Sequence, residues 1–230
     1  IKIFADGASI EDIKVTNKNE LVSGFTTNPT LMLSAGVTSY YDFAKNVSLL
    51  IGEKPISFEV LEEDHDKIFE QAQKLYKLSK NVFVKIPIVG STGLSNISVI
   101  KKVIETGIKI NIKALFTFQQ LNEIKNNIKI TDQIIISIFA GRIADTGVDP
   151  IPIMKEAISM YKDYVNVEIL WASPREVLNY YQALSIGCHI ITMPADLISK
   201  LRLYHKDLLQ YSIETSKMFY DDAKRANYSL

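Results

Sequence analysis

Residues Val82–Ile88 read Val-Phe-Val-Lys-Ile-Pro-Ile, an apolar and largely β-branched run that a single lysine interrupts. A nearly continuous apolar run of this length is typical of a parallel strand that is covered on both faces. A lysine within such a strand must face a pocket or a charged partner, because an unpaired ammonium group is costly to bury. The stretch therefore predicts a buried parallel sheet and marks Lys85 as a candidate functional residue.

Seven further runs of the same kind lie on either side of this one. They are Ile1–Asp6, Gly24–Asn28, Pro55–Val60, Ile108–Phe116, Ile134–Ala140, Val165–Ala172 and His189–Pro194. Segments with helical periodicity separate them, and no linker or change of composition divides the chain. Eight strand–helix units predict an α/β fold, a single (β/α)8 TIM barrel spanning residues 1–230.

The helical segments have recognisable boundaries. Asp64–Lys80 carries an apolar stripe opposite its charges, and Gly93–Gly107 ends at a glycine. Asn28-Pro29 and Ser173-Pro174 each place a capping residue before a proline, which predicts two helix starts.

A doubly wound open sheet is the alternative fold, but such sheets usually have fewer strands. The first strand also lacks the Gly-x-Gly-x-x-Gly sequence of a dinucleotide-binding fold.

Composition excludes several classes of protein. Lys+Arg and Asp+Glu both number 26, so the chain has no basic excess for nucleic acid. The single cysteine, Cys188, excludes a disulfide framework and fits a reducing, cytoplasmic compartment. No apolar run is long enough to cross a membrane. The three histidines have no metal-ligand spacing, so we expect neither a metal nor another cofactor.

Polar residues recur at the ends of the apolar runs, where a barrel carries its active site. Lys85 is the strongest of them, because desolvation favours the neutral amine that can form a Schiff base. An ion pair with Glu59 is the structural alternative for this lysine. The candidate site residues are Asp6, Thr26, Asn28, Glu59, Lys85, Asn111, Lys113, Ser137, Arg142, Ser173 and Arg175, whereas the eighth run contributes only Thr192.

Arginine is scarce, with four among 26 cationic residues, yet Arg142 and Arg175 follow the sixth and seventh runs. Their planar, bidentate donors suit a phosphate or carboxylate. Ser173 adds a hydroxyl group, and the helix predicted at Ser173-Pro174 adds free backbone N–H groups. Salt bridges from these arginines to Asp145 or Glu176 are the structural alternative.

Several of these residues stand in motifs that resemble transaldolases, especially the short subfamily that includes fructose-6-phosphate aldolases. The resemblance covers nearly the whole chain, and the Thr-Thr-Asn-Pro and Lys-Ile-Pro strings are specific when they occur together. The motifs are Ala5-Asp6, Thr26-Thr27-Asn28-Pro29-Thr30, Glu59-Val60, Val84-Lys85-Ile86-Pro87, Asn111 before Leu115-Phe116, Ser137-x-Phe139-x-Gly141-Arg142 and Ala172-Ser173-x-Arg175.

The resemblance implies a class I enzyme that transfers a dihydroxyacetone unit between sugar phosphates through a lysine Schiff base. Lys85 would be the nucleophile, Asp6 the general acid/base, and Glu59 would act through an ordered water. The other implied roles are binding of the dihydroxyacetone hydroxyls by Asn28, Asn111 and Ser137, support of Asp6 or the substrate by Thr26, and binding of phosphate by Arg142, Ser173 and Arg175. Glu59 favours a transaldolase, because fructose-6-phosphate aldolases have glutamine at the matching place.

Three positions around the pocket depart from the family pattern. Lys113 replaces a threonine, and Gly7 follows Asp6 where threonine or serine is common. The 88–93 segment lacks the family's threonine soon after the Lys-Ile-Pro string and is one residue longer. Lys113 shares parity with Asn111 and should point into the barrel near Lys85. There it could lower the pKa of Lys85 or bind an anionic substrate group, unless a local bulge turns it outward.

These departures keep two alternatives open. One is an aldolase that releases free dihydroxyacetone, or a transaldolase relative with an altered substrate. The other is a non-catalytic barrel that binds sugar phosphates.

Residues 195–230 form a long amphipathic extension that one barrel helix does not need. In short transaldolase relatives such a tail packs on neighbouring subunits, which implies a homo-oligomer, as a pentamer or a decamer.

Overall fold

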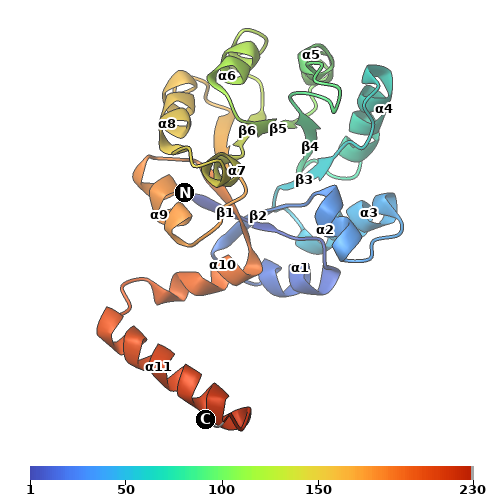
Figure 1. Ribbon diagram of the computed structural model, residues 1–230. Coiled ribbons are helices and arrows are strands. Elements are labelled where there is room, and N and C mark those ends of the chain that lie inside the picture. Colours follow the sequence, from blue (N-terminus) through green and yellow to red (C-terminus); the bar gives the residue numbers. More distant parts are fainter. Residues whose placement is uncertain (229–230) are drawn as a thin grey trace. The chain divides into compact units, whose positions relative to one another are not determined.

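The computed structural model describes residues 1–228, so the last two positions of the predicted 195–230 extension lie outside the described residues. Eight parallel strands close into a barrel in the order of the sequence, and Figure 1 shows them as a central ring with helices outside. The (β/α)8 prediction is confirmed. The strands are β1 (Lys2–Asp6), β2 (Val22–Thr26), β3 (Ile56–Glu59), β4 (Val82–Pro87), β5 (Ile110–Leu115), β6 (Ile134–Ile138), β7 (Val167–Trp171) and β8 (Ile190–Pro194).

All eight predicted runs contain a strand, although most are trimmed at their ends. The largest difference is β2, which begins at Val22 rather than Gly24 and ends at Thr26 rather than Asn28. Asn28 leaves the strand because its side chain accepts a hydrogen bond from the N–H of Leu31, 2.9 Å away, and caps the next helix. The predicted helix start at Asn28-Pro29 is therefore confirmed.

The helices that surround the barrel are short. Two are α4 and α5, which lie within the predicted segments 64–80 and 93–107. The set is α1 (Ile10–Asn17), α2 (Pro29–Ser34), α3 (Tyr40–Ile51), α4 (His65–Tyr76), α5 (Ile97–Ile104), α6 (Phe118–Lys125), α7 (Ala140–Asp145), α8 (Ile151–Met160), α9 (Leu178–Ser185) and α10 (Ala195–Lys200).

The helix start predicted at Ser173-Pro174 is wrong. Ser173 has a φ of 60°, and α9 begins only at Leu178. The segment before α9 is held instead by Asn179, whose side-chain oxygen accepts hydrogen bonds from the N–H groups of Arg175 and Glu176. The free N–H groups expected directly after Ser173 are consequently not at this position.

An apolar layer fills the barrel beneath the carboxyl ends of the strands. Phe4, Ile135, Leu170 and Ile190 are buried and form one cluster, against which Phe83 packs. Each lies two residues before a position that faces the carboxyl-end mouth of the barrel, because alternate residues of a strand share a face. This layer closes the barrel from below and leaves its polar layer at the mouth.

Residues Ile1–Ile198 form one compact unit, and a second unit begins at Ser199. The second unit contains a 3₁₀ turn (Leu201–Leu203) and α11 (Leu208–Arg225), separated by His205 with a φ of 57°. The predicted extension is therefore not one continuous helix. None of residues 199–228 is buried. No helix within residues 1–228 combines the length and apolar character needed to cross a bilayer.

Candidate active site

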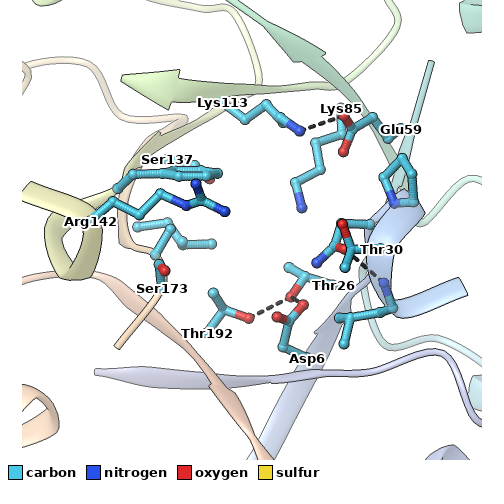
Figure 2. A pocket seen from close by; sticks show the side chains of 16 residues that line it. Asp6, Thr26, Thr30, Glu59, Lys85, Lys113, Ser137, Arg142, Ser173 and Thr192 are labelled. Atoms are coloured by element: carbon cyan, nitrogen blue, oxygen red, sulfur yellow. Dashed lines mark hydrogen bonds and ion pairs between the residues drawn. The ribbon is translucent and has the colours of Figure 1, made fainter. Parts of the chain in front are cut away.

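A cavity of about 410 Å³ opens at the carboxyl ends of the strands. Figure 2 shows charged and hydroxyl side chains converging on it from several strands and from the loops that follow them. Nine of the eleven residues proposed from the sequence line it, whereas Asn111 and Arg175 do not. The nine are Asp6, Thr26, Asn28, Glu59, Lys85, Lys113, Ser137, Arg142 and Ser173.

Lys85 stands at the centre of this arrangement, on β4. Its side chain points into the cavity, only 7% of the residue is exposed, and Nζ donates a hydrogen bond to the Thr27 carbonyl at 2.9 Å. Burial lowers the pKa of Lys85, and the charge of Lys113 lowers it further, while Asp6 and Glu59 oppose the change. The surroundings therefore favour the neutral, nucleophilic form of the amine.

Asp6 ends β1 and faces the same cavity. The hydroxyl of Thr26 donates a hydrogen bond to its carboxylate at 2.7 Å and also contacts the hydroxyl of Thr192. Burial raises the pKa of Asp6, and the opposing influences are Lys85, the Thr26 hydroxyl and Lys113. A carboxyl group with a raised pKa beside an amine with a lowered pKa is suited to exchanging protons with a substrate.

Glu59 and Lys113 form an ion pair beside Lys85, shown by a dashed line in Figure 2. The pair is largely withdrawn from solvent, with side-chain exposures of 9% for Glu59 and 15% for Lys113. Lys113 therefore points inward. Its charge lowers the pKa of Lys85, which is the direction expected from the sequence. The register between β5 and β6 does shift between Ile112 and Leu115, where Ala114 has a φ of 60°, but Lys113 still pairs with Pro87 on β4 and is not turned outward.

Asn111 lies below the cavity and is fully buried. Its amide nitrogen donates to the Ser57 hydroxyl at 2.9 Å, and its amide oxygen accepts from the Ser137 hydroxyl at 2.7 Å. The structure thus places Asn111 as a link between β3 and β6 that orients Ser137, the member of the chain that reaches the cavity. Ser57 was not singled out from the sequence, although it lies two residues before Glu59 on the same face.

Arg142 and Ser173 line the side of the cavity opposite Lys85, as Figure 2 shows. Arg142 lies on α7, and its guanidinium sits 5.9 Å from the centre of the Phe139 ring. The α7 backbone can approach Ser173 only because residue 141 is glycine. A Cβ atom there would lie 1.5 Å from the Ser173 carbonyl oxygen. This contact joins the loops after β6 and β7.

Arg175 has a different environment. Its Nε donates to Asp145 at 3.0 Å, and a second guanidinium nitrogen bonds the other carboxylate oxygen. Both side chains are about half exposed, and the guanidinium holds the pKa of Asp145 below its ordinary value. The salt bridge considered as an alternative for this arginine is therefore present, and Arg175 is not brought to the cavity wall.

Several lining residues were given no role from the sequence. Thr192, the residue that the eighth run contributes, lies on β8 and completes the hydroxyl pair behind Asp6. Phe139 and Leu170 form an apolar part of the wall, which residue type alone does not distinguish from core. Within residues 1–228, no cluster of three or more His, Cys, Asp and Glu side chains could hold a metal ion.

Comparisons with known proteins identify the family of the chain. The sequence profile described as "Transaldolase/Fructose-6-phosphate aldolase" matches residues 3–229. A protein of Bdellovibrio bacteriovorus named "Probable transaldolase" is 32% identical over 228 residues, 98% of this chain and 99% of the relative. One of the same name from a Thermoanaerobacter species is 30% identical over 202 residues, 87% and 89% of the two chains.

Among solved structures, one titled "Native KDPGal structure" matches with a TM-score of 0.56 and 12% identity, over 86% of this chain and 84% of that one. At this identity the likeness concerns the fold alone. Together, the barrel and the ionisable groups at its carboxyl end define a (β/α)8 protein with an enzyme-like pocket. The chain belongs to the transaldolase/fructose-6-phosphate aldolase family.

Proposed function

We propose that this protein is a transaldolase that moves a dihydroxyacetone unit between sugar phosphates through a Schiff base on Lys85. The single observation that carries the proposal is the buried Lys85 amine, which faces the cavity between two carboxylates, Asp6 and Glu59. Such a site has the nucleophile and the proton-transfer groups that class I aldol chemistry needs.

In the first stage, the neutral Lys85 amine attacks the C2 carbonyl of a ketose and forms a carbinolamine. Uptake of one proton and loss of the former carbonyl oxygen as water give the protonated Schiff base. Glu59 serves this stage through a water held at its carboxylate. The lowered pKa of Lys85 increases the fraction of amine that is ready to attack at neutral pH.

In the second stage, Asp6 accepts the proton of the C4 hydroxyl as the C3–C4 bond breaks. The electron pair of that bond forms the C2–C3 double bond of an enamine, the π pair of the iminium group moves onto nitrogen, and the aldose leaves. An acceptor aldehyde then reacts in reverse: the enamine attacks its carbonyl carbon, and Asp6 returns the proton to the new hydroxyl. One water hydrolyses the Schiff base and frees Lys85.

The remaining groups divide between the two ends of the sugar. Asn28 and Ser137 line the cavity with Lys85 and bind the dihydroxyacetone hydroxyls, with Asn111 orienting Ser137 through a hydrogen bond. Arg142 and Ser173 lie across the cavity and bind the phosphate. Arg175 joins the phosphate site only after its bond to Asp145 has been exchanged for the substrate.

Borohydride trapping with fructose 6-phosphate tests this proposal. We expect intact-mass and peptide mass spectrometry to find a dihydroxyacetone-sized adduct on Lys85, and Lys85→Met to remove it. An adduct on Lys113 would reassign the nucleophile. No adduct with fructose 6-phosphate or sedoheptulose 7-phosphate would contradict the proposal, and would favour another donor or a barrel that only binds sugar phosphates. In the latter case Lys85→Ala would leave sugar-phosphate binding unchanged.

An aldolase that releases free dihydroxyacetone is the second candidate. The specific observation that bears on it is the Glu59–Lys113 pair, because the water held by Glu59 serves both formation of the Schiff base and the reverse step, its hydrolysis. Turnover of fructose 6-phosphate should be measured with and without erythrose 4-phosphate as acceptor. A transaldolase needs the acceptor, whereas equal rates without it would establish the aldolase.

We also propose a homo-oligomer, as a pentamer or a decamer, in a cytoplasmic compartment. Leu208, Leu209, Ile213 and Phe219 of α11 are each more than half exposed, and so many large apolar side chains on one helix are typical of an interaction surface. A second copy of the chain is the partner that we expect to cover them. Light scattering that gave a monomer mass would contradict this, and cell fractionation tests the compartment.

A further inference from the structure

The ion pair between Glu59 and Lys113 crosses the strand that carries the amine. In the barrel, β4 lies between β3 and β5, and Glu59 is the register partner of Lys85 on β3. Lys113, on β5, pairs in register with Pro87, two residues nearer the carboxyl end of β4 than Lys85. The pair therefore connects the two neighbours of β4 directly beside the Lys85 side chain.

The surroundings make this pair sensitive to the loss of either partner. Glu59 and Lys113 are both largely buried, and the second carboxylate oxygen of Glu59, Oε2, is buried without a hydrogen-bond partner among the described residues. Lys113 is thus the one cation in direct ionic contact with this carboxylate within residues 1–228. Without it, Glu59 would carry an uncompensated buried charge next to Lys85.

Lys85 itself makes its hydrogen bond with a neutral group, the Thr27 carbonyl, rather than with a carboxylate. A carboxylate that paired with Lys85 would favour the ammonium form and remove the nucleophile. Because Lys113 occupies Oε1 of Glu59, the carboxylate next to Lys85 in register already has an ion-pair partner.

We propose that Lys113 is a positioning residue for the reaction: it holds Glu59 in a buried ion pair across β4 and thereby leaves the Lys85 amine free to act as the nucleophile. This inference rests on the proposed function for its purpose, but the state of the amine can be measured without any sugar. The alternative, in which Lys113 is mobile and binds the substrate, is disfavoured, because an anionic group of the substrate would have to compete with Glu59 for Lys113.

Four charged groups face Lys85, and their effects can be separated. Asp6 approaches from β1, Glu59 from β3, Lys113 from β5 and Arg142 from α7 across the cavity. Removing the Lys113 charge should favour the ammonium form of Lys85, because repulsion is lost and Glu59 is released. Removing the Glu59 charge should favour the neutral amine, because Lys113 then acts unopposed.

Competitive acetylation across the range from about pH 6 to pH 10 measures this directly. The intact protein is treated with a trace of acetic anhydride without substrate, and peptide mass spectrometry compares Lys85 with exposed lysines. In Lys113→Met, we expect the half-labelling pH of Lys85 to rise by about one unit. In Glu59→Gln it should fall, and in the double variant it should return close to the wild-type value.

Lys125→Met, which removes an exposed lysine of α6, is the matched control and should leave the labelling curve unchanged. If Lys113→Met does not fold, Lys113→Gln retains a hydrogen-bond donor for Glu59 without the charge, and the same alkaline shift is expected. A folded Lys113 variant with the wild-type Lys85 curve would overturn the inference. Failure of sugar trapping in the wild type would remove the proposed function but leave these curves interpretable.

Discussion

Two ion pairs on the carboxyl side of the barrel invite comparison, because each holds a cation that the sequence offered as a substrate ligand. Lys113 binds Glu59 with side-chain exposures of 15% and 9%, beside Lys85. Arg175 binds Asp145 with exposures of 48% and 49%, between the loops that follow β6 and β7. Both are pairs of a cationic side chain and a carboxylate, but the first is largely buried and the second is about half exposed to water.

The difference lies in what water does for each partner. An exposed ion pair contributes little, because water solvates either charge when the other is removed. A buried pair is costly to break, because the remaining charge has no such alternative. We therefore expect the Lys113–Glu59 pair to control both stability and the state of Lys85, and the Arg175–Asp145 pair to be exchangeable for a substrate anion.

The largest expected effect is on kcat/KM and comes from removing the Lys85 amine, which lies beside the buried pair. Lys85→Met should lower kcat/KM by at least about a thousandfold, because no other group can replace the covalent intermediate. Coupled assays with fructose 6-phosphate and erythrose 4-phosphate measure it, with Lys125→Met as the control. If Lys85→Met kept more than a tenth of the activity, Lys113 would become the candidate nucleophile.

The next effect concerns the stability of the buried pair. Lys113→Met should reduce the free energy of unfolding by about 3 kcal/mol, because the buried Glu59 carboxylate loses its partner and only the costly burial of an ammonium group on Lys85 can replace it. Urea unfolding followed by circular dichroism measures this. Adding Glu59→Gln should restore much of the loss, since the double variant has no unpaired charge. Additive losses in the double variant would show that the two residues are not coupled.

An intermediate effect is expected at Gly141, which brings α7 and its Arg142 against the loop of Ser173. In Gly141→Ala, the added Cβ collides with the Ser173 carbonyl, so the backbone of one loop has to move. We expect kcat/KM for phosphorylated sugars to fall by roughly tenfold to a hundredfold. Gly90→Ala, whose Cβ would make only an ordinary 3.9 Å contact, is the control. Equal kinetics for both variants would exclude this role.

The smallest effect is predicted for the exposed pair. Arg175→Gln should leave the melting temperature unchanged within error, because both side chains remain accessible to water. KM for phosphorylated sugars measures whether Arg175 exchanges Asp145 for phosphate, and we expect a modest rise of about threefold to tenfold. A drop in melting temperature as large as that of Lys113→Met would erase the distinction between the two pairs.

Much of the barrel and its mouth could be predicted from the sequence. The periodicity of apolar runs predicts eight strands, and strand-end position predicts which polar side chains converge, as for Asp6 and Lys85. Prediction failed at Ser173, where a capping sequence did not start a helix. The close approach of Gly141, which comes from the preceding strand–helix unit, constrains the backbone at Ser173, and a capping pattern in the local sequence does not show this tertiary contact.

Parity along a strand determines that Lys113 shares the face of Asn111, and this needs only the sequence. Which partner each lysine finds depends on atoms from other strands. The closed barrel brings Glu59 of β3 and Lys113 of β5 together across β4, and places the Thr27 carbonyl next to Lys85. Local propensities fix the faces of the strands, whereas ion pairs and pKa shifts depend on distance and desolvation, which only the tertiary structure sets.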